Sequence, residues 1–382
     1  MNVAIASFGE KGKKLYELLK ADNKKKYNVV CIFDADCNLW GNACSDEDVK
    51  VVSSGKAVKM YQSGAFDKFI IPSLSETVVN DILSTLHNYE IPSEACLYSP
   101  IEVFCDKNLC DEERILKICS FETHTELDAM EIHVTDHCNL SCKHCTMFAG
   151  LVPKDSYDDF DATINGLHKL KEFFSHVKKF RVLGGEPLLN SRLDEYLDDI
   201  RCTYPYAEIQ LISNGLLVKS MPNKLINSIQ KNNVVLYISY YNILADAADD
   251  IDFFLKQHNI NHVFTKPITT FQKVYDAFGN SDYKAAFYSC TWRRDGCETL
   301  KNGTIAPCFV PFVIHYLSDK FDLGIEPSGT IDLFEPGLTT AEIRRRLRIP
   351  FKLCKYCSQS HQNADWEMCD SQSANKISDW SI

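Results

Sequence analysis

The stretch that decides the fold runs from Asp136 to Cys145 and reads Asp-His-Cys-Asn-Leu-Ser-Cys-Lys-His-Cys. Its cysteines, Cys138, Cys142 and Cys145, are separated by three and then two residues. Because an apolar segment that predicts a strand comes just before, the thiolates should converge from one tight loop at a strand end. Three such ligands can hold a [4Fe-4S] cluster whose fourth iron stays open to a reactant. A zinc ion with a distant fourth ligand and buried free thiols are the alternatives.

The composition is that of a globular protein rich in cysteine. The chain has 382 residues, of which 45% are hydrophobic and 17 are cysteine, and its formal net charge is -11. These values exclude a disordered chain, a collagen and a coiled coil. The acidic balance predicts neither a nucleic-acid partner nor a membrane partner, and no apolar run reaches the roughly 18 residues of a membrane span.

The cysteine count also indicates a reducing compartment. It is odd and too dilute for a disulfide scaffold. Residues 1–12 show neither the basic region nor the cleavage site of an export signal. We therefore expect a cytoplasmic protein whose clustered cysteines bind a metal or iron–sulfur clusters.

Strand and helix patterns alternate along most of the chain and predict an α/β fold of three domains. Residues 1–122 should form a Rossmann-like parallel sheet, residues 123–285 a partial (β/α)6 TIM-like barrel, and residues 286–382 a small cysteine-rich domain. In the first domain Gly9 and Gly12 follow the first strand, which departs from the dinucleotide-binding spacing. That domain is either a nucleotide or nucleotide-sugar site or a scaffold without ligand.

Two more motifs end predicted barrel strands, Gly184-Gly185-Glu186-Pro187 and Ser213-Asn214. Together with the three cysteines of the loop and with His144 before the third of them, they resemble the radical S-adenosylmethionine (SAM) superfamily over roughly residues 125–370. Two glycines let backbone approach a ligand, and a carboxylate can accept a bond from the SAM ammonium. The alternative for each motif is an ordinary strand-ending turn. The resemblance assigns these residues to the SAM site: Gly184, Gly185, Glu186, Pro187, Ser213, Asn214, Ser239 and His144.

A second cysteine group follows the predicted barrel. Its members are Cys290, Cys308, Cys354 and Cys357. Their spacing resembles the auxiliary-cluster extension of the superfamily in its shorter, twitch form, because the longer SPASM form needs further cysteines. The resemblance implies a second [4Fe-4S] cluster, ligated entirely by protein, that accepts electrons or orients the substrate. A structural zinc site is the alternative, and Cys297 and Cys369 are alternative ligands.

The fourth predicted barrel strand alternates, and it should turn Tyr237, Ser239 and Tyr241 toward a polar lumen. With an auxiliary cluster as electron acceptor, the resemblance implies an oxidoreductase. It would cleave SAM and abstract hydrogen from a secondary alcohol of a carbohydrate-type substrate, which could be free or linked to a nucleotide. A flavodoxin or ferredoxin would be the electron donor. Oxidation of an alcohol also needs a base. The candidates, each of which has a plain structural alternative, are Arg293, Arg294, Asp295, Lys266 and Tyr241.

Two other functions stay open at this point. A radical SAM enzyme could instead epimerise its substrate without net oxidation, or it could modify a peptide. The alternative from a different class of protein is that the chain is a non-catalytic iron–sulfur or zinc protein that binds nucleotide sugars.

Overall fold

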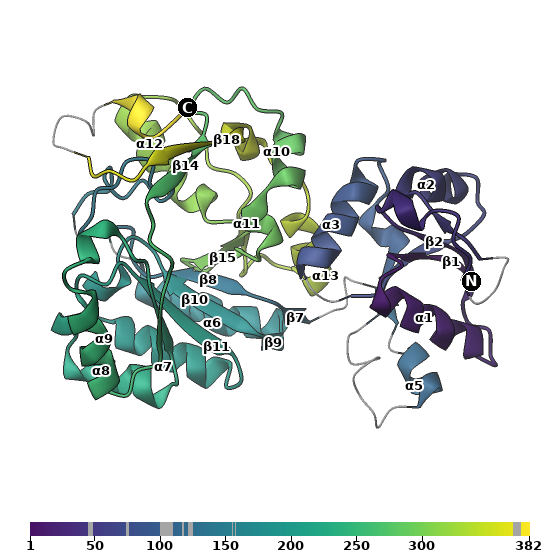
Figure 1. Ribbon diagram of the computed structural model, residues 1–382, viewed down its shortest axis with the longest axis horizontal. Helices are drawn as coiled ribbons and strands as arrows, with labels where there is room; N and C mark the ends of the chain where they lie inside the picture. The colour runs from purple at the N-terminus through teal and green to yellow at the C-terminus, as the bar shows by residue number, and fades with distance from the viewer. Residues whose placement is uncertain are drawn as a thin grey trace. The chain divides into compact units, whose positions relative to one another are not determined.

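The computed structural model describes residues 1–44, 49–73, 76–99, 110–116, 118–120, 125–154, 156, 158–369 and 376–382. The chain forms two compact units, each with its own sheets (Figure 1). One comprises Met1–His124 with Thr340–Arg345, and the other Thr125–Thr339 with Arg346–Ile382. The predicted border at residue 122 lies outside the described residues. The division of the second unit at residue 285 stays a prediction.

The first unit is built on a six-stranded sheet in the order β3-β2-β1-β4-β5-β6, in which only β6 is antiparallel to its neighbour. This is the order of a doubly wound nucleotide-binding sheet, so the Rossmann-like prediction is confirmed. Its strands are β1 Asn2–Ala6, β2 Asn28–Phe33, β3 Val51–Val52, β4 Lys68–Ile71, β5 Cys96–Tyr98 and β6 Cys119–Ser120. Its helices include α1 Glu10–Ala21, α2 Ser54–Gln62, α3 Glu76–His87 and α5 Asp111–Leu116.

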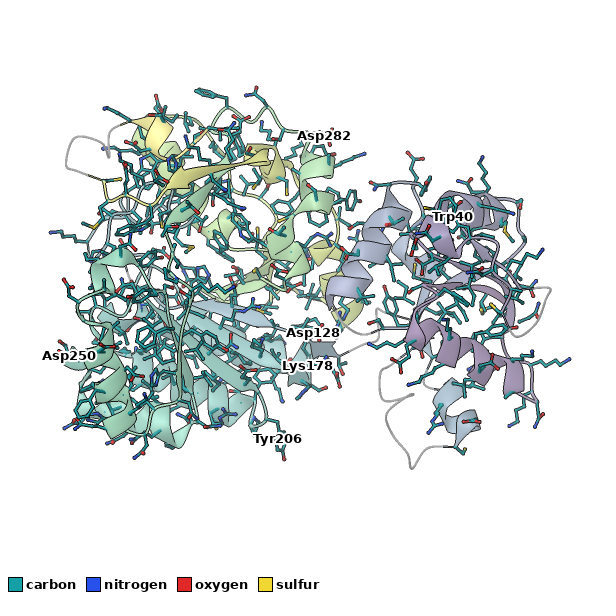
Figure 2. All side chains as sticks on the ribbon, in the orientation of Figure 1. Trp40, Asp128, Lys178, Tyr206, Asp250 and Asp282 are labelled. Carbon is teal, nitrogen blue, oxygen red and sulfur yellow. The ribbon has the colours of Figure 1, made fainter. Side chains whose placement is uncertain are left out.

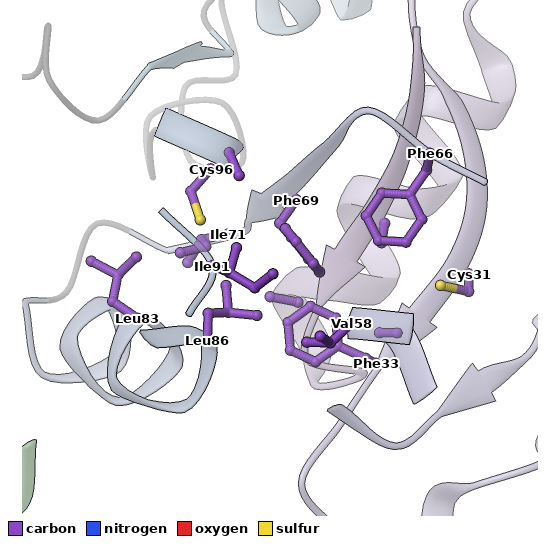
Figure 3. Packing of buried hydrophobic residues seen from close by; sticks show 14 of the residues in the cluster. Cys31, Phe33, Val58, Phe66, Phe69, Ile71, Leu83, Leu86, Ile91 and Cys96 are labelled. Atoms are coloured by element: carbon purple, nitrogen blue, oxygen red, sulfur yellow. The ribbon is translucent and has the colours of Figure 1, made fainter. Parts of the chain in front are cut away.

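Apolar side chains of the strands, α2 and α3 form one core of this unit (Figure 3). Phe69 packs edge-to-face on Phe66 and Phe33, with ring centres 4.9 and 5.6 Å apart. Cys31 and Cys96 are buried in the same cluster, and burial raises the pKa of the Cys31 thiol to about 11. These two cysteines therefore behave as apolar core residues.

The second unit contains an eight-stranded sheet in the order β13-β12-β11-β10-β8-β15-β16-β17. Its strands are β8 Met130–His133, β10 Lys179–Leu183, β11 Glu208–Ser213, β12 Val235–Ile238, β13 His262–Phe264, β15 Thr299–Lys301, β16 Thr304–Ala306 and β17 Ile331–Asp332. Two smaller sheets pair β7 Glu126–Leu127 with β9 His176–Val177, and β14 Thr270–Tyr275 with β18 Cys357–Asp365. Asp128 and Lys178, 2.5 Å apart, form an ion pair beside the β7–β9 pair (Figure 2).

Helices cover the outer side of the parallel strands, as a partial barrel requires (Figure 1). They are α6 Phe160–Phe173, α7 Leu193–Thr203, α8 Asn223–Lys231 and α9 Ala248–Gln257. The remaining helices of this unit include α10 Tyr283–Ser289, α11 Thr291–Arg294 and α12 Val310–Phe321, while α13 Thr340–Leu347 contributes to both units. The predicted α/β class with a partial TIM-like barrel is thus confirmed.

The barrel sheet departs from the expected alternation of strand and helix at its sixth strand. After β13 the next strand, β14, leaves the sheet and pairs antiparallel with β18. The position beside β8 is filled instead by β15, which runs parallel to β8 and belongs to a hairpin with β16. Asn302 and Gly303 form the hairpin turn that the sequence predicted, and both have positive φ, 48° and 75°.

A buried ion pair joins this hairpin to the beginning of the cysteine loop. Lys301 Nζ lies 2.6 Å from both carboxylate oxygens of Asp136, and the two side chains are only 8% exposed. The Tyr316 hydroxyl donates a further bond to Asp136 over 2.8 Å. Because a buried charge without its partner is costly, this network fixes the backbone two residues before Cys138.

A second buried carboxylate, Asp158, predicts how stability depends on pH. Its side chain accepts bonds from the hydroxyls of Thr163 and Tyr196, and burial raises its pKa to about 7. An aspartate in an unfolded chain ionises near pH ~3.9. The folded protein therefore keeps a proton that the unfolded chain releases between about pH 4 and 7, and the free energy of unfolding falls as pH rises through that range, by at most about 1.4 kcal/mol per pH unit.

We predict that Asp158→Asn, which carries no titrating proton, loses this contribution. The Tm of the variant minus that of the parent should increase between about pH 5 and 7, measured anaerobically by thermal unfolding. Asp161→Asn is the control, because Asp161 lies three residues further along, in the first turn of α6, and its side chain is 82% exposed. Parallel Tm curves for parent and Asp158→Asn would contradict the prediction.

Candidate active site

The cysteine loop follows β8 and turns its three thiols toward one pocket. Cys142 is buried, Cys138 and Cys145 are half-buried, and all three line this pocket. The backbone N–H of Leu140 donates to Cys138 Sγ over 3.4 Å, and Trp366 Nε1 donates to Cys142 Sγ over 3.3 Å. The structure thus brings together the three residues that the sequence predicted as ligands.

Burial makes these cysteines weak acids as free thiols. It raises the pKa of both Cys138 and Cys142 to about 12 and also raises that of Cys145. The Leu140 N–H works against the shift at Cys138, and the Trp366 N–H does so at Cys142. Since cluster ligands are thiolates, binding an iron–sulfur cluster here releases protons.

The glycine motif is pressed against the backbone that carries the loop. Gly185 N–H donates to Thr135 O over 2.7 Å, and Glu186 N–H donates to His137 O over 2.9 Å. A Cβ on Gly184 would lie 2.0 Å from Thr135 O, and one on Gly185 would lie 2.1 Å from His137 O. Gly184 also has φ +146°, which side chains disfavour. Only glycines allow this approach.

The side chain of Glu186 is not where the sequence placed it. It was expected to receive the SAM ammonium, but it is fully buried and does not line the pocket. Its carboxylate instead accepts bonds from Ser213 Oγ at 2.8 Å, from Asn214 N at 2.8 Å and from Leu188 N at 3.1 Å. Burial nevertheless raises its pKa to about 7. Glu186 therefore joins the ends of β10 and β11 and positions the pocket wall, while the Gly184–Gly185 backbone faces the pocket.

The pocket itself has a volume of about 390 Å³, a size typical of small-molecule sites. Its wall comes from the cysteine loop and from the ends of β10, β11, β12 and β14. Six of the eight residues expected to contact SAM line it, namely Gly184, Gly185, Ser213, Asn214, Ser239 and His144. Pro187 does not; it begins the short 3-10 helix Pro187–Leu189 behind the glycines.

The second cysteine group converges on another cavity. Cys290, Cys308, Cys354 and Cys357 all line it, together with Trp292 and Arg293. Cys297 lies elsewhere, 3.8 Å from Arg181 Nη1 in the barrel, and Cys369 N–H donates to Ser141 O beside the first loop. Neither alternative ligand therefore lines this cavity, and the four thiols fit a cluster ligated entirely by protein.

Of the base candidates whose side chains the structure describes, Tyr241 alone lines the first pocket, where burial raises its pKa. Arg293 lies in the second cavity, buried, with its guanidinium 4.6 Å from the centre of the Phe287 ring and Nε donating to Phe287 O. Asp295 is exposed, and Lys266 does not line the pocket. Arg293, Asp295 and Lys266 therefore do not line this pocket, and a role for any of them as a base stays a prediction. The side chain of Arg294 lies outside the described residues.

Several pocket residues escaped the sequence analysis. Thr270, Phe271, Gln272 and Val274 of β14 line the pocket, and so does Trp292 of α11. The position of Trp292 two residues after Cys290 was a usable signal. The pairing of β14 with β18 was not, because their contact spans a long separation in sequence.

Both donor sets fit iron–sulfur ligation by their chemistry, since three thiols line one cavity and four thiols line another. Within the described part of the chain, no three His, Cys, Asp or Glu side chains are arranged to hold a single metal ion. The assignment of individual ligands stays a prediction.

Comparison with known proteins agrees with the geometry of the first pocket. Residues 132–283 match the family model of the radical SAM superfamily. The chain contains a radical SAM domain. A GTP 3′,8-cyclase of Helicobacter pylori is 32% identical over 108 residues, 27% of this chain and 32% of the relative. A GTP 3′,8-cyclase of Staphylococcus saprophyticus is 30% identical over 154 residues, 38% and 40% of the two chains. The chain thus spans about a third to two fifths of the length of these curated relatives.

Among solved structures, that of BtrN in complex with AdoMet and 2-DOIA is 16% identical, covers 61% of this chain and 94% of the other, and gives a TM-score of 0.36. The radical SAM domain makes the chain an enzyme, so the non-catalytic alternative is wrong. The predicted cofactors, SAM and two [4Fe-4S] clusters, are confirmed. The assignment of the second cluster to a twitch-type domain stays a prediction.

The predicted substrate and reaction are corrected by the relatives. Oxidation of a carbohydrate alcohol was expected, but the curated relatives are named for a cyclisation of GTP, a nucleotide. The expectation was wrong because it relied on cysteine spacing and on a polar lumen, neither of which identifies a substrate.

In the described ranges, no helix is both long enough and apolar enough to cross a bilayer.

The close contact at Gly185 predicts that a single methyl group added at this residue weakens SAM binding. Gly185→Ala must push the glycine strand end away from His137, and overpacking of this kind costs about 1–3 kcal/mol. We expect SAM binding by the anaerobically loaded protein to weaken roughly tenfold, measured by equilibrium dialysis. Gly337→Ala is the control, since no atom lies within 4 Å of the Cβ position of Gly337. Unchanged affinity in Gly185→Ala would contradict the proposed role of this contact.

Proposed function

We propose that this chain is a radical SAM enzyme that acts on a purine nucleotide, with Cys138, Cys142 and Cys145 as ligands of the cluster that binds SAM. The nucleotide is suggested by the GTP 3′,8-cyclases that the chain resembles. The observation that carries the proposal is the continuity of the first pocket with the second cysteine group.

That continuity runs along β14 and α11. Gln272, Val274 and Trp292 line the first pocket and also a cavity of about 50 Å³ that reaches Cys290 and Cys357. A molecule in the first pocket would therefore lie between the two cysteine groups. The residues that line the first pocket are neutral or weakly ionising, and none of them is lysine or arginine. This lining suits a nucleoside moiety better than a triphosphate.

The residues of the chain would divide the work as follows. When bound, the first cluster and SAM would supply the chemistry for abstracting a hydrogen atom from a ribose carbon. Gly184 and Gly185 would present backbone to the methionine part of SAM, with Ser213, Asn214 and Ser239 along its other side. Trp292 offers a flat aromatic face for the base of the nucleotide, and Gln272 offers an amide for its polar edge.

The second cysteine group would hold a cluster whose irons are all ligated by protein, so the nucleotide would bind through side chains and not through iron. A flavodoxin or ferredoxin would deliver the electron that starts the reaction, which fits a location in the reducing cytoplasm. The oxidoreductase class stays a prediction that product analysis decides.

The test uses the full chain, reconstituted anaerobically with iron and sulfide and reduced with dithionite. We predict that GTP or guanosine stimulates the formation of 5′-deoxyadenosine from SAM, and that GTP deuterated at C3′ transfers its label to that product. UDP-glucose serves as a matched sugar nucleotide without a purine. Stimulation by UDP-glucose alone, or stimulation by GTP without label transfer from any ribose carbon, would contradict the proposal.

A second prediction concerns Trp292. Stacking of a base on an aromatic side chain contributes about 1–3 kcal/mol. Trp292→Ala should therefore raise the KM for the nucleotide by roughly tenfold while the affinity for SAM stays unchanged, whereas Trp292→Phe should retain most of the binding. Phe253→Ala, an exposed aromatic on α9, is the control. An equal loss for SAM and nucleotide would show that Trp292 supports the fold and does not bind the base.

A further inference from the structure

A segment more than two hundred residues downstream pairs with the cysteine loop. Lys143 N–H donates to Glu367 O over 2.9 Å, and Cys369 N–H donates to Ser141 O over 2.6 Å. Between them, Cys142 and Met368 form an antiparallel bridge. We call residues 366–369 the loop strap. It directly follows β18, so one short segment of the chain leads from Cys357 of the second cysteine group to the first cysteine loop.

Trp366, the first residue of the loop strap, is held from several sides. Its backbone N–H donates to Thr269 O over 2.8 Å. Its ring stacks on Tyr241 with centres 5.2 Å apart and planes inclined by 22°. Tyr241 is in turn packed on Phe271 of β14. Trp366 is only partly exposed, and these contacts leave its ring little freedom to turn.

The indole N–H of Trp366 points at the sulfur of Cys142, one of the three proposed ligands of the first cluster. It donates to Cys142 Sγ over 3.3 Å, within the range of N–H···S bonds. A hydrogen bond to a ligand sulfur stabilises the reduced cluster, which carries one more negative charge, relative to the oxidised cluster. The reduction potential of the first cluster should therefore be higher with this bond than without it.

We propose that Trp366 is a positioning residue that sets the reduction potential of the SAM-binding cluster through its bond to Cys142. The loop strap holds the indole, and the indole fixes the Cys142 sulfur electrostatically. This inference rests on the proposed ligation by Cys142 but not on the identity of the substrate.

The test is a potentiometric titration of the holoenzyme with SAM present, followed by the EPR signal that SAM shifts. Trp366→Phe keeps an aromatic ring for the stack on Tyr241 but removes the N–H. We expect its midpoint potential to become more negative, so that at a fixed potential the ratio of reduced to oxidised cluster falls up to about tenfold, which equals about 59 mV for one electron. Because a midpoint potential does not depend on loading, a partly loaded variant still gives a valid reading.

Trp40→Phe is the matched control, since Trp40 also donates its indole N–H, to Asp34 O, but in the other unit. Its potential should equal that of the parent. If Trp366→Phe binds no cluster, pulsed ENDOR of the parent with tryptophan labelled by 15N in the indole replaces the titration, and a coupling of an indole nitrogen to the SAM-shifted signal is expected. An unchanged potential, or no such coupling, would overturn the inference. If the parent protein shows no EPR signal that SAM shifts, the result would instead refute ligation of the cluster by Cys142.

Discussion

The second unit depends on one close contact between backbones, that of Gly184 and Gly185 with the end of β8. A side chain at either glycine would overlap a carbonyl at about 2 Å, so the backbone just after β10 can approach the backbone just after β8 only because both residues are glycine. This contact lies directly before the cysteine loop and forms one side of the pocket. Glu186 then joins β10 to β11 through Ser213 and Asn214, so three successive strand ends act as one wall.

Motifs near one another in sequence were predictable for a physical reason. Ligand spacing on one loop, as in Cys138 to Cys145, is fixed by local geometry and leaves few chemistries. Strand ends such as Gly184 and Ser213 must lie together because parallel strands align their carboxyl ends at one edge. The Asn302-Gly303 turn was equally local, because only residues that tolerate positive φ suit it.

Features that depend on distant pairing were not predictable. No local signal shows that β14 leaves the barrel sheet, that β15 takes the place beside β8, or that Trp366 reaches Cys142. The direction of the Glu186 side chain was missed because a backbone motif does not reveal which buried donors surround it. The substrate was missed for a different reason: the lining of a pocket constrains polarity and shape, which several molecules share.

The central claim is that the two cysteine groups, which line separate cavities joined along β14 and α11, hold two iron–sulfur clusters. X-ray anomalous scattering at the iron edge, from crystals of the full chain grown anaerobically with SAM, tests it most directly. The account predicts iron at two places, one bounded by Cys138, Cys142 and Cys145 with SAM on its open side, the other by Cys290, Cys308, Cys354 and Cys357. A signal in either place that appears only above the zinc edge, or no iron beside Cys142, would contradict it.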